Sequence, residues 1–252
     1  MCGRYAATSS PERLAEEFEA QDVTGGGLRE DYNVAPTKDV PVVRERTDDD
    51  GTRIRRIELM RWGLVPSWAK DTTIGNRMIN ARIESVADKA AFRLAAKRRR
   101  CLVPADGWYE WAPASPDQRG KQPYFMTRSD GHPLAFAGLY ELWRPKEAES
   151  DAPWLVTVTV ITEPAIGVLA EIHDRMPYVL APDQWDRWLD TQTTDVTGLL
   201  VATPEDYVAQ LEVRPVSTAV NNVRNNGPEL VSVVPLGPPA GDEQTSAPLP
   251  GV

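Results

Sequence analysis

Segments rich in β-branched residues, separated by short polar turns, limit most strongly how this chain can fold. Residues 40–46 and 53–59 flank the polar run 47–52, which is typical of an antiparallel hairpin. Residues 124–128 and 134–142 read as a second hairpin across Ser129-Asp130-Gly131. Helices interrupt these strands irregularly. The pattern therefore predicts an antiparallel α+β fold and not a regular β-α-β array.

Capping residues and apolar spacing predict the helices. Ser10 and Pro11 mark a helix start, and Leu14 and Phe18 fall four residues apart on one face. Ser85 is spaced three residues before Asp88, as in a helix N-terminal capping pair. The Ser85 cap predicts a helix over residues 85–99, and Thr162 is expected to cap a short helix from Glu163 to about residue 172. Two more helices are expected over residues 182–189 and 204–211, the second capped by Thr203.

Two aromatic stretches have different predicted structures. Residues 60–68 contain too much Gly, Pro and Trp for a regular element and are expected to form a loop. Residues 101–111 form a strand-like run, and 154–161 is strongly β-branched. In a two-residue period Trp108 and Glu110 share one face of the strand. A carboxyl in such an apolar setting has a raised pKa and suits proton transfer near neutrality.

Composition fits a soluble globular chain, with 41% apolar residues among 252. The start has no basic segment followed by an apolar run, and no stretch approaches the length of a membrane span. We therefore expect a cytoplasmic monomer with no membrane contact. Residues 1–236 are interpreted as a single domain and residues 237–252 as a disordered, acidic, Pro/Gly-rich tail.

Charge is unevenly distributed along the sequence. The net charge is −9, yet residues 53–100 contain 13 Lys or Arg against 4 acidic residues, a local balance of +9. A basic middle on an acidic protein is compatible with a local site for an anionic ligand. The alternative for residues 97–100 is a solvated helix end whose cations favour the C-terminal dipole. Two cysteines, Cys2 and Cys101, give neither a disulfide framework nor a metal site, so no metal or cofactor is predicted.

Cys2 directly follows the initiator methionine. Removal of Met1 would leave an α-amine and a thiol on adjacent carbons, a 1,2-aminothiol. Their ordinary pKa values are about 7.7–8.0 and about 8.5, so both have a reactive fraction near neutrality. One group can attack an aldehyde and the other can close a ring. Position alone leaves open the alternative of an inert, partly buried cysteine.

Other candidate residues are scattered through the sequence. His173 lies at a predicted element boundary, where a histidine is often structural, and His132 reads as an exposed turn residue. Arg77, Arg82 and Arg175 read equally as salt-bridge partners or as ligands of an anion.

Six blocks in a fixed order carry a resemblance to a known family: 1–5, 32–36, 61–68, 80–85, 104–111 and 173–177. Together they span Cys2 to about Val234 and resemble the SRAP family, the SOS-response-associated peptidases that process abasic sites. The resemblance implies an antiparallel, barrel-like β-sheet flanked by helices. It also implies single-stranded DNA bearing an abasic site as the partner, and association with the nucleoid when the protein is on damaged DNA.

The resemblance assigns roles by position. Cys2 is similar to the family's nucleophile, Asn80 to its sensing asparagine, Glu110 to its carboxylate and His173 to its histidine. The implied DNA-binding residues are Arg4, Pro36, Trp68, Arg77, Arg82, Trp111 and Arg175, in which the arginines bind phosphates and the proline and tryptophans stack on or wedge between bases.

The implied chemistry is a covalent thiazolidine between Cys2 and the opened sugar, after autocatalytic loss of Met1. Two alternatives remain at this stage. An N-terminal-nucleophile glutamine amidotransferase also begins Met-Cys-Gly but needs a four-layer sheet sandwich. A non-catalytic module would bind single strands through Trp62, Trp68 and Trp111 with Cys2 inert.

Overall fold

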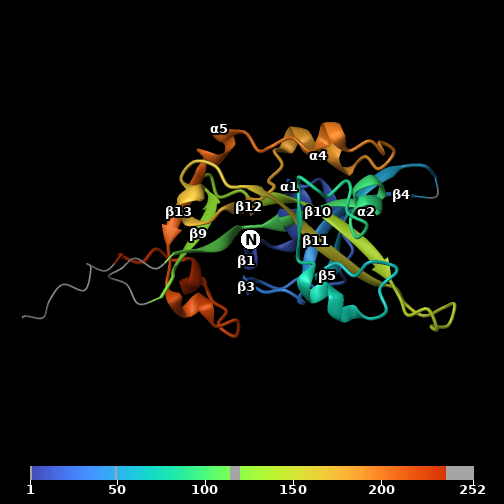
Figure 1. The fold of residues 1–252 in the computed structure, drawn as a ribbon, viewed down its shortest axis with the longest axis horizontal. Coiled ribbons are helices and arrows are strands. Elements are labelled where there is room, and N and C mark those ends of the chain that lie inside the picture. Colours follow the sequence, from blue (N-terminus) through green and yellow to red (C-terminus); the bar gives the residue numbers. More distant parts are fainter. Residues whose placement is uncertain (1, 49, 114–119, 237–252) are drawn as a thin grey trace, which may run out of the picture.

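Two β-sheets make up most of the fold in the computed structural model, which describes residues 2–48, 50–113 and 120–236 (Figure 1). One sheet has five strands in the order β13-β9-β8-β1-β3. Its strands are β1 (Tyr5–Ala7), β3 (Asp31–Val34), β8 (Gly107–Ala112), β9 (Gln122–Arg128) and β13 (Leu211–Pro215). We call it the small sheet. Each of its neighbouring pairs is antiparallel.

The second sheet, here called the large sheet, has eight strands in the order β12-β11-β10-β7-β4-β5-β2, with β6 beside β11. Its strands are β2 (Ala20–Asp22), β4 (Asp39–Thr47), β5 (Arg53–Trp62), β6 (Asn80–Arg82), β7 (Arg100–Ala105), β10 (Leu134–Trp143), β11 (Leu155–Pro164) and β12 (Arg175–Pro177). The hairpin predicted across residues 47–52 is confirmed, because β4 and β5 pair antiparallel from Asp39–Arg61 to Thr47–Arg53.

A short parallel contact closes part of the large sheet on itself. Thr157 and Val158 of β11 lie opposite Arg61 and Trp62 of β5. The strands β11, β10, β7, β4 and β5 therefore form a closed ring, which removes two exposed strand edges. This confirms the predicted α+β fold with a barrel-like, mainly antiparallel sheet.

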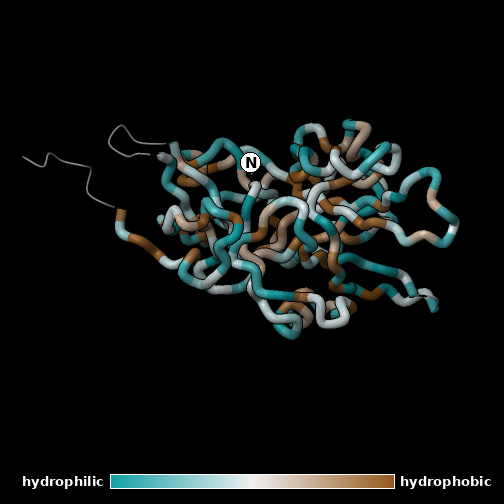
Figure 2. Tube along the Cα trace, turned by 90° about the horizontal axis from the view of Figure 1, so that it is seen from below, coloured by the Kyte–Doolittle hydropathy of each residue, from teal (hydrophilic) through white to brown (hydrophobic). Residues whose placement is uncertain are grey.

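Alternation along β10 shows how the core is divided. Leu134 and Phe136 join the cluster that also contains Cys2 and Trp108. Ala135, Ala137 and Leu139 point the other way, into a cluster under the helices. Both faces of this strand are buried, so its sequence is almost continuously apolar. Figure 2 shows hydrophobic segments concentrated inside the molecule and many hydrophilic loops at its outside.

The helices are short, and several of them pack against the large sheet. They are α1 (Pro11–Glu17), α2 (Arg93–Arg98), α3 (Leu169–Ile172), α4 (Pro182–Leu189) and α5 (Glu205–Val208), with 3₁₀ turns η1 (Thr72–Arg77), η2 (Thr197–Leu199), η3 (Thr218–Asn221) and η4 (Pro228–Val231). The helix predicted to start at Ser10 and Pro11 is confirmed as α1, because Ser10 Oγ accepts a hydrogen bond from the Arg13 N–H and Leu14 is buried. Helix α4 also matches its predicted bounds, and Trp185 and Trp188 are buried beneath it.

Three helix predictions are wrong in extent. Residues 85–92 form turns, and α2 begins only at Arg93. β11 continues through Pro164, so Thr162 is a strand residue and α3 begins at Leu169. The Thr203 hydroxyl donates to the buried Glu163 carboxylate and does not cap the predicted helix over residues 204–211. That helix, α5, ends at Val208, and the strand β13 that follows it was not predicted. Tertiary contacts outweighed local helix signals in each case.

Two strand predictions fail where the chain changes sheets. The run 101–111 splits at Asp106 into β7 and β8, which belong to different sheets. The Asp106 carboxylate accepts hydrogen bonds from Thr8 and Ser9, which hold this bend. Similarly, β9 and β10 are not a hairpin, since β9 pairs with β8 and β13. Residues 60–62, predicted as loop, complete β5.

Some expectations fall outside the described residues. The tail of residues 237–252 is among them. Within the described ranges, no helix combines the length and apolarity that crossing a bilayer requires.

Gly107, the first residue of β8, lets this strand lie close against β9. A Cβ placed there would lie 2.3 Å from Phe125 Cζ and 2.4 Å from the Met126 carbonyl oxygen, so backbone would have to move. We expect Gly107→Ala to lower the free energy of unfolding by about 1–3 kcal/mol through overpacking. Urea denaturation measures this change. Gly198→Ala is the control, because its Cβ meets only the flexible end of Arg187. Equal midpoints for both variants would contradict the assignment.

Candidate active site

Four residues that the sequence keeps far apart meet where the two sheets adjoin. Cys2 precedes β1 and Glu110 lies in β8, both in the small sheet. Asn80 lies in β6 of the large sheet, and His173 lies between α3 and β12. Figure 1 shows β1 in the middle of the molecule, with β9 and β13 on one side and β10 and β11 on the other. The predicted catalytic residues therefore occupy one region.

Cys2 is fully buried in the main core cluster. Burial raises the pKa of its thiol, and the nearby Glu110 carboxylate raises it further. The Asn80 side-chain amide donates to the Cys2 carbonyl oxygen at 2.7 Å and so fixes the backbone at Cys2. Asn80 Oδ1 is buried and has no hydrogen-bond partner among the described residues. It is an acceptor available to a ligand beside Cys2.

Strand pairing explains how Glu110 reaches the start of the chain. Tyr5 lies opposite Trp108, and the Tyr109 N–H donates to the Arg4 carbonyl oxygen at 3.0 Å. The same antiparallel register continued by one residue places Glu110 beside Gly3. Burial raises the pKa of Glu110 to about 8. Glu110 is therefore mainly a protonated acid at neutral pH and can also act as a base, as the sequence pattern indicated.

His173 is positioned by the turn that enters β12. The Arg175 N–H donates to His173 Nδ1 at 3.0 Å, so the neutral ring keeps its proton on Nε2. Nε2 lies 3.9 Å from Glu110 Oε2. Burial lowers the pKa of His173, although the Asp174 carboxylate, 3.0 Å from Nδ1, opposes this shift. The geometry thus directs an N–H of a neutral imidazole toward the Glu110 carboxyl.

Arg4 and Trp111 form a second group next to this centre. Arg4 Nη1 donates to Asn33 Oδ1 at 2.7 Å and to the Val220 carbonyl at 2.8 Å. The Arg4 guanidinium lies 5.7 Å from the Trp111 ring centroid. Trp111 Nε1 donates to Asn221 at 2.6 Å. Burial lowers the pKa of Arg4. Asn33 is the residue that sequence reasoning missed here; its place in the block 32–36 was the available signal.

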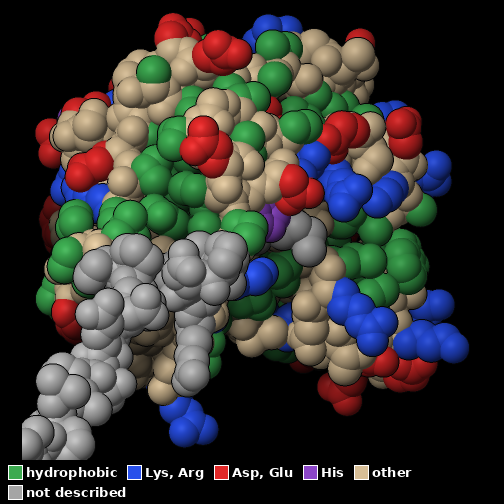
Figure 3. Space-filling model, turned by 60° about the vertical axis from the view of Figure 1, so that its left-hand side comes forward, with side chains coloured by type: hydrophobic (Ala, Val, Ile, Leu, Met, Phe, Trp, Pro, Cys, Tyr) green, Lys and Arg blue, Asp and Glu red, His purple; other side chains and the backbone are tan. Residues whose placement is uncertain are grey.

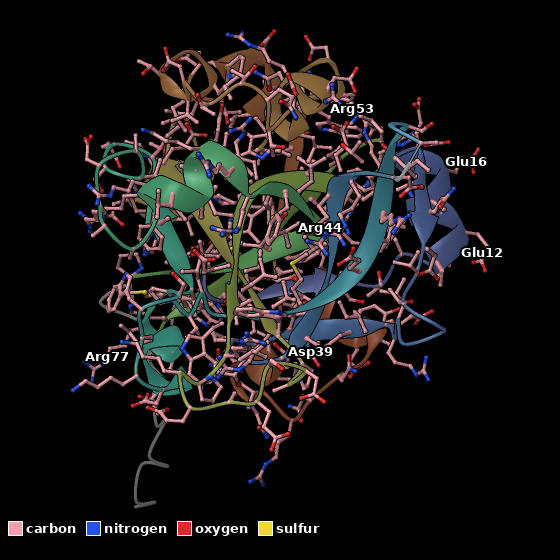
Figure 4. The ribbon with its side chains drawn as sticks, turned by 90° about the vertical axis from the view of Figure 1, so that its right-hand side faces the viewer. Glu12, Glu16, Asp39, Arg44, Arg53 and Arg77 are labelled. Atoms are coloured by element: carbon pink, nitrogen blue, oxygen red, sulfur yellow. The ribbon has the colours of Figure 1, made fainter. Side chains whose placement is uncertain are left out.

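The remaining predicted DNA-binding residues lie farther out. Trp68 is 55% exposed and lines a surface hollow with Lys70 and Arg77. Figure 4 shows Arg77 pointing away from the η1 segment into solvent. Arg82 is exposed in β6, and Pro36 is half-buried in the turn after β3. The DNA-binding roles of these residues stay predictions.

Arg175 differs from the other predicted arginines because it is buried and engaged. Both of its Nη groups contact the Glu84 carboxylate, and Nη2 also donates to the Thr162 carbonyl at 2.5 Å. The pKa of Glu84 is lowered by these hydrogen bonds. Its phosphate-binding role stays a prediction. Glu84 was quoted in the family block but given no role from sequence.

The surface around the fold is unevenly charged. Figure 3 shows Lys and Arg side chains gathered along one side of the view and acidic side chains more frequent above them.

Both cysteines are free thiols. Among the described residues, no group of three His, Cys, Asp or Glu side chains is arranged to bind a metal ion.

Comparison with known proteins identifies the family. The model of the SOS response associated peptidase (SRAP) family matches residues 1–223. The chain is 36% identical over 232 residues to the abasic site processing protein YoqW of Bacillus subtilis, covering 92% of this chain and 99% of that protein. It is 32% identical over 278 residues to the abasic site processing protein HMCES of Gallus gallus, covering 95% and 80% respectively.

A solved structure confirms the fold independently. A protein of Bacteroides thetaiotaomicron superposes with a TM-score of 0.77 at 21% identity, covering 92% of this chain and 100% of that one. With the family model matching most of the sequence and the relatives matching nearly all of it, this chain belongs to the SRAP family.

Proposed function

We propose that this protein processes abasic sites in single-stranded DNA by forming a covalent thiazolidine through Cys2, after removing Met1 autocatalytically. One observation carries the proposal. The buried Cys2, with its carbonyl held by Asn80, lies beside a carboxyl group with a raised pKa that is itself next to His173. The names of the similar proteins, abasic site processing proteins, support the same substrate.

The reaction balances with the residues at hand. The free α-amine of Cys2 adds to the C1′ aldehyde of the opened sugar and gives a carbinolamine. Protonated Glu110 donates a proton to the carbinolamine hydroxyl, which leaves as water, and a protonated imine remains. The thiol sulfur then adds to the carbon of this iminium, its proton passes to the Glu110 carboxylate, and the ring nitrogen keeps its N–H. Both heads of the aminothiol are then bonded to one carbon.

The burial of Cys2 determines which proton donors and acceptors the reaction needs. Desolvation keeps the Cys2 thiol neutral, so the sulfur requires a base at the moment of attack. Glu110 becomes that base once it has protonated the departing hydroxyl. His173 lies next to Glu110 and, in its protonated imidazolium form, is suited to protonating the sugar ring oxygen during opening and to returning protons when the link reverses.

DNA binding around this centre would be independent of sequence. Exposed arginines such as Arg77 and Arg82 would contact phosphates, and Trp68 would stack on bases for about 1–3 kcal/mol. The unpartnered Asn80 Oδ1 would accept from a sugar hydroxyl. The closed barrel does not match the sheet sandwich that the amidotransferase alternative requires.

The first prediction about the reaction concerns Cys2 as the nucleophile. Protein whose loss of Met1 is verified by mass spectrometry should give a shifted band on a denaturing gel with single-stranded DNA bearing one abasic site. Cys2→Ala should abolish the band while noncovalent binding persists, which also separates catalysis from a binding module. Cys2→Ser should form no stable product. DNA whose abasic aldehyde is reduced to an alcohol is the substrate control. A full yield with Cys2→Ala would refute the assignment.

The second prediction concerns pH. Below about pH 8 the Cys2 amine is increasingly protonated and unreactive. Above about pH 8 Glu110 loses the proton needed for dehydration. The crosslinking rate of the wild type should therefore peak near this pH. Glu110→Gln should be about 100-fold slower or more and should lack the alkaline fall. Persistence of that fall in the variant, measured by quenched time courses, would assign it to another group.

The third prediction concerns reversal. Purified adduct is incubated with methoxyamine, which captures the released aldehyde and prevents renewed crosslinking. His173→Gln should release DNA about 10-fold more slowly or more, because a proton donor next to Glu110 is lost. His132→Gln is the matched control, since His132 lies in an exposed turn and pairs with Glu17. Equal release by wild type and His173→Gln would contradict the role of His173.

A further inference from the structure

Three strands of the large sheet converge at Thr162, close to the proposed active site. Thr162 of β11 lies opposite Arg82 of β6 and opposite Pro177 of β12. The Ile83 N–H donates to the Thr162 carbonyl at 2.8 Å. The contact between β6 and β11 extends over only three residue pairs, and so does that between β11 and β12. Such short ladders fix the ends of β6 and β12 only weakly by themselves.

The side chain of Arg175 ties these three strands together. From β12 it donates to the carbonyl of Thr162 in β11 at 2.5 Å and contacts both carboxylate oxygens of Glu84, just beyond β6. The Arg175 residue is only 9% exposed, whereas the Glu84 side chain is 48% exposed. A two-pronged guanidinium–carboxylate contact fixes direction as well as distance.

Both ends of this ion pair lead directly to active-site residues. Asn80, which holds the Cys2 carbonyl, stands four residues before Glu84. His173 stands two residues before Arg175 and accepts the Arg175 backbone N–H at Nδ1. Displacement of Arg175 would therefore release both the orientation of the imidazole and the hydrogen bond that selects its tautomer.

We propose that Glu84 is a positioning residue: its ion pair with Arg175 holds Asn80 and His173 in register across the sheet so that both face Cys2 and Glu110. The proposal deepens, and rests on, the crosslinking function proposed above. It gives Arg175 a structural role in addition to the phosphate binding that the resemblance implies. Glu84 and the Thr162 carbonyl engage three of the five guanidinium N–H donors, and Nε has no partner among the described residues, so a phosphate could bind beside the ion pair.

Kinetics separate the two roles. Glu84→Ala should lower the crosslinking rate at saturating DNA between about 10-fold and 100-fold, the range expected when reacting groups shift by up to an ångström. Noncovalent affinity, measured in a Cys2→Ala background, should be unchanged. Glu84→Gln, which retains one acceptor for Arg175, should recover part of the rate. Glu212→Ala is the matched control, because Glu212 is 43% exposed, pairs with Arg214 and lies in β13.

A spectroscopic measurement on DNA-free protein tests the same proposal without the chemistry. Nitrogen-15 NMR should show neutral His173 with its proton on Nε2 in the wild type and a mixture of tautomers in Glu84→Ala. An unchanged tautomer together with an unchanged crosslinking rate would overturn the proposal. A gain in DNA affinity at an unchanged rate would also overturn it and favour Arg175 as a phosphate ligand that Glu84 covers. Absence of any crosslink by wild type would defeat the proposed function, while the tautomer result still decides the role of Glu84.

Discussion

The pairing of β1 on both of its edges is the constraint on which the site depends. Chain ends usually fray because few contacts hold them. Here Tyr5 is paired with Val34 of β3 on one side and with Trp108 of β8 on the other, and its ring packs at 5.2 Å from that of Trp62. The strand is only three residues long, yet it anchors the residues before it inside the core. Cys2 is buried as a consequence, and the neighbouring strand supplies Glu110.

Burial then sets the charge state of the whole centre by one physical cause. Desolvation penalises each charged form, so it raises the pKa of the Cys2 thiol and of Glu110 and lowers that of His173. The groups that would exchange protons in the proposed reaction are thereby all biased toward neutrality. A neutral acid, a neutral thiol and a neutral imidazole can pass protons among themselves without leaving a buried charge unpaired. The same chemistry in water would begin from a carboxylate at neutral pH.

Sequence patterns predicted those parts of the fold that local chemistry determines. The β4–β5 hairpin has a polar loop between two β-rich runs, and α1 has its own cap and proline, so neither needs distant contacts. Changes of sheet were not predictable, because the bend at Asp106 is held by donors about 97 residues away. For the site, the strand alternation indicated Glu110, and the resemblance indicated Cys2, Asn80 and His173. The pairing of Arg175 with Glu84 had no local signal, because the two residues are 91 positions apart.

The division of the site between the two sheets has a consequence for how the protein is built. Glu110 lies in the small sheet and Cys2 leads into it at β1, whereas Asn80 lies in the large sheet and His173 leads into it at β12. Each pair is therefore attached to its own sheet, and the packing between the sheets, together with the Asn80–Cys2 hydrogen bond, sets the distance between the pairs. Phe136 of β10 contributes to that packing, since its ring meets those of both Tyr5 and Trp108 edge-on. A small change at this aromatic contact would shift the two sheets relative to each other at little cost in free energy. Such a shift would disturb the Asn80–Cys2 hydrogen bond before it unfolded either sheet. The geometry of the site is thus a property of the tertiary contact between the sheets.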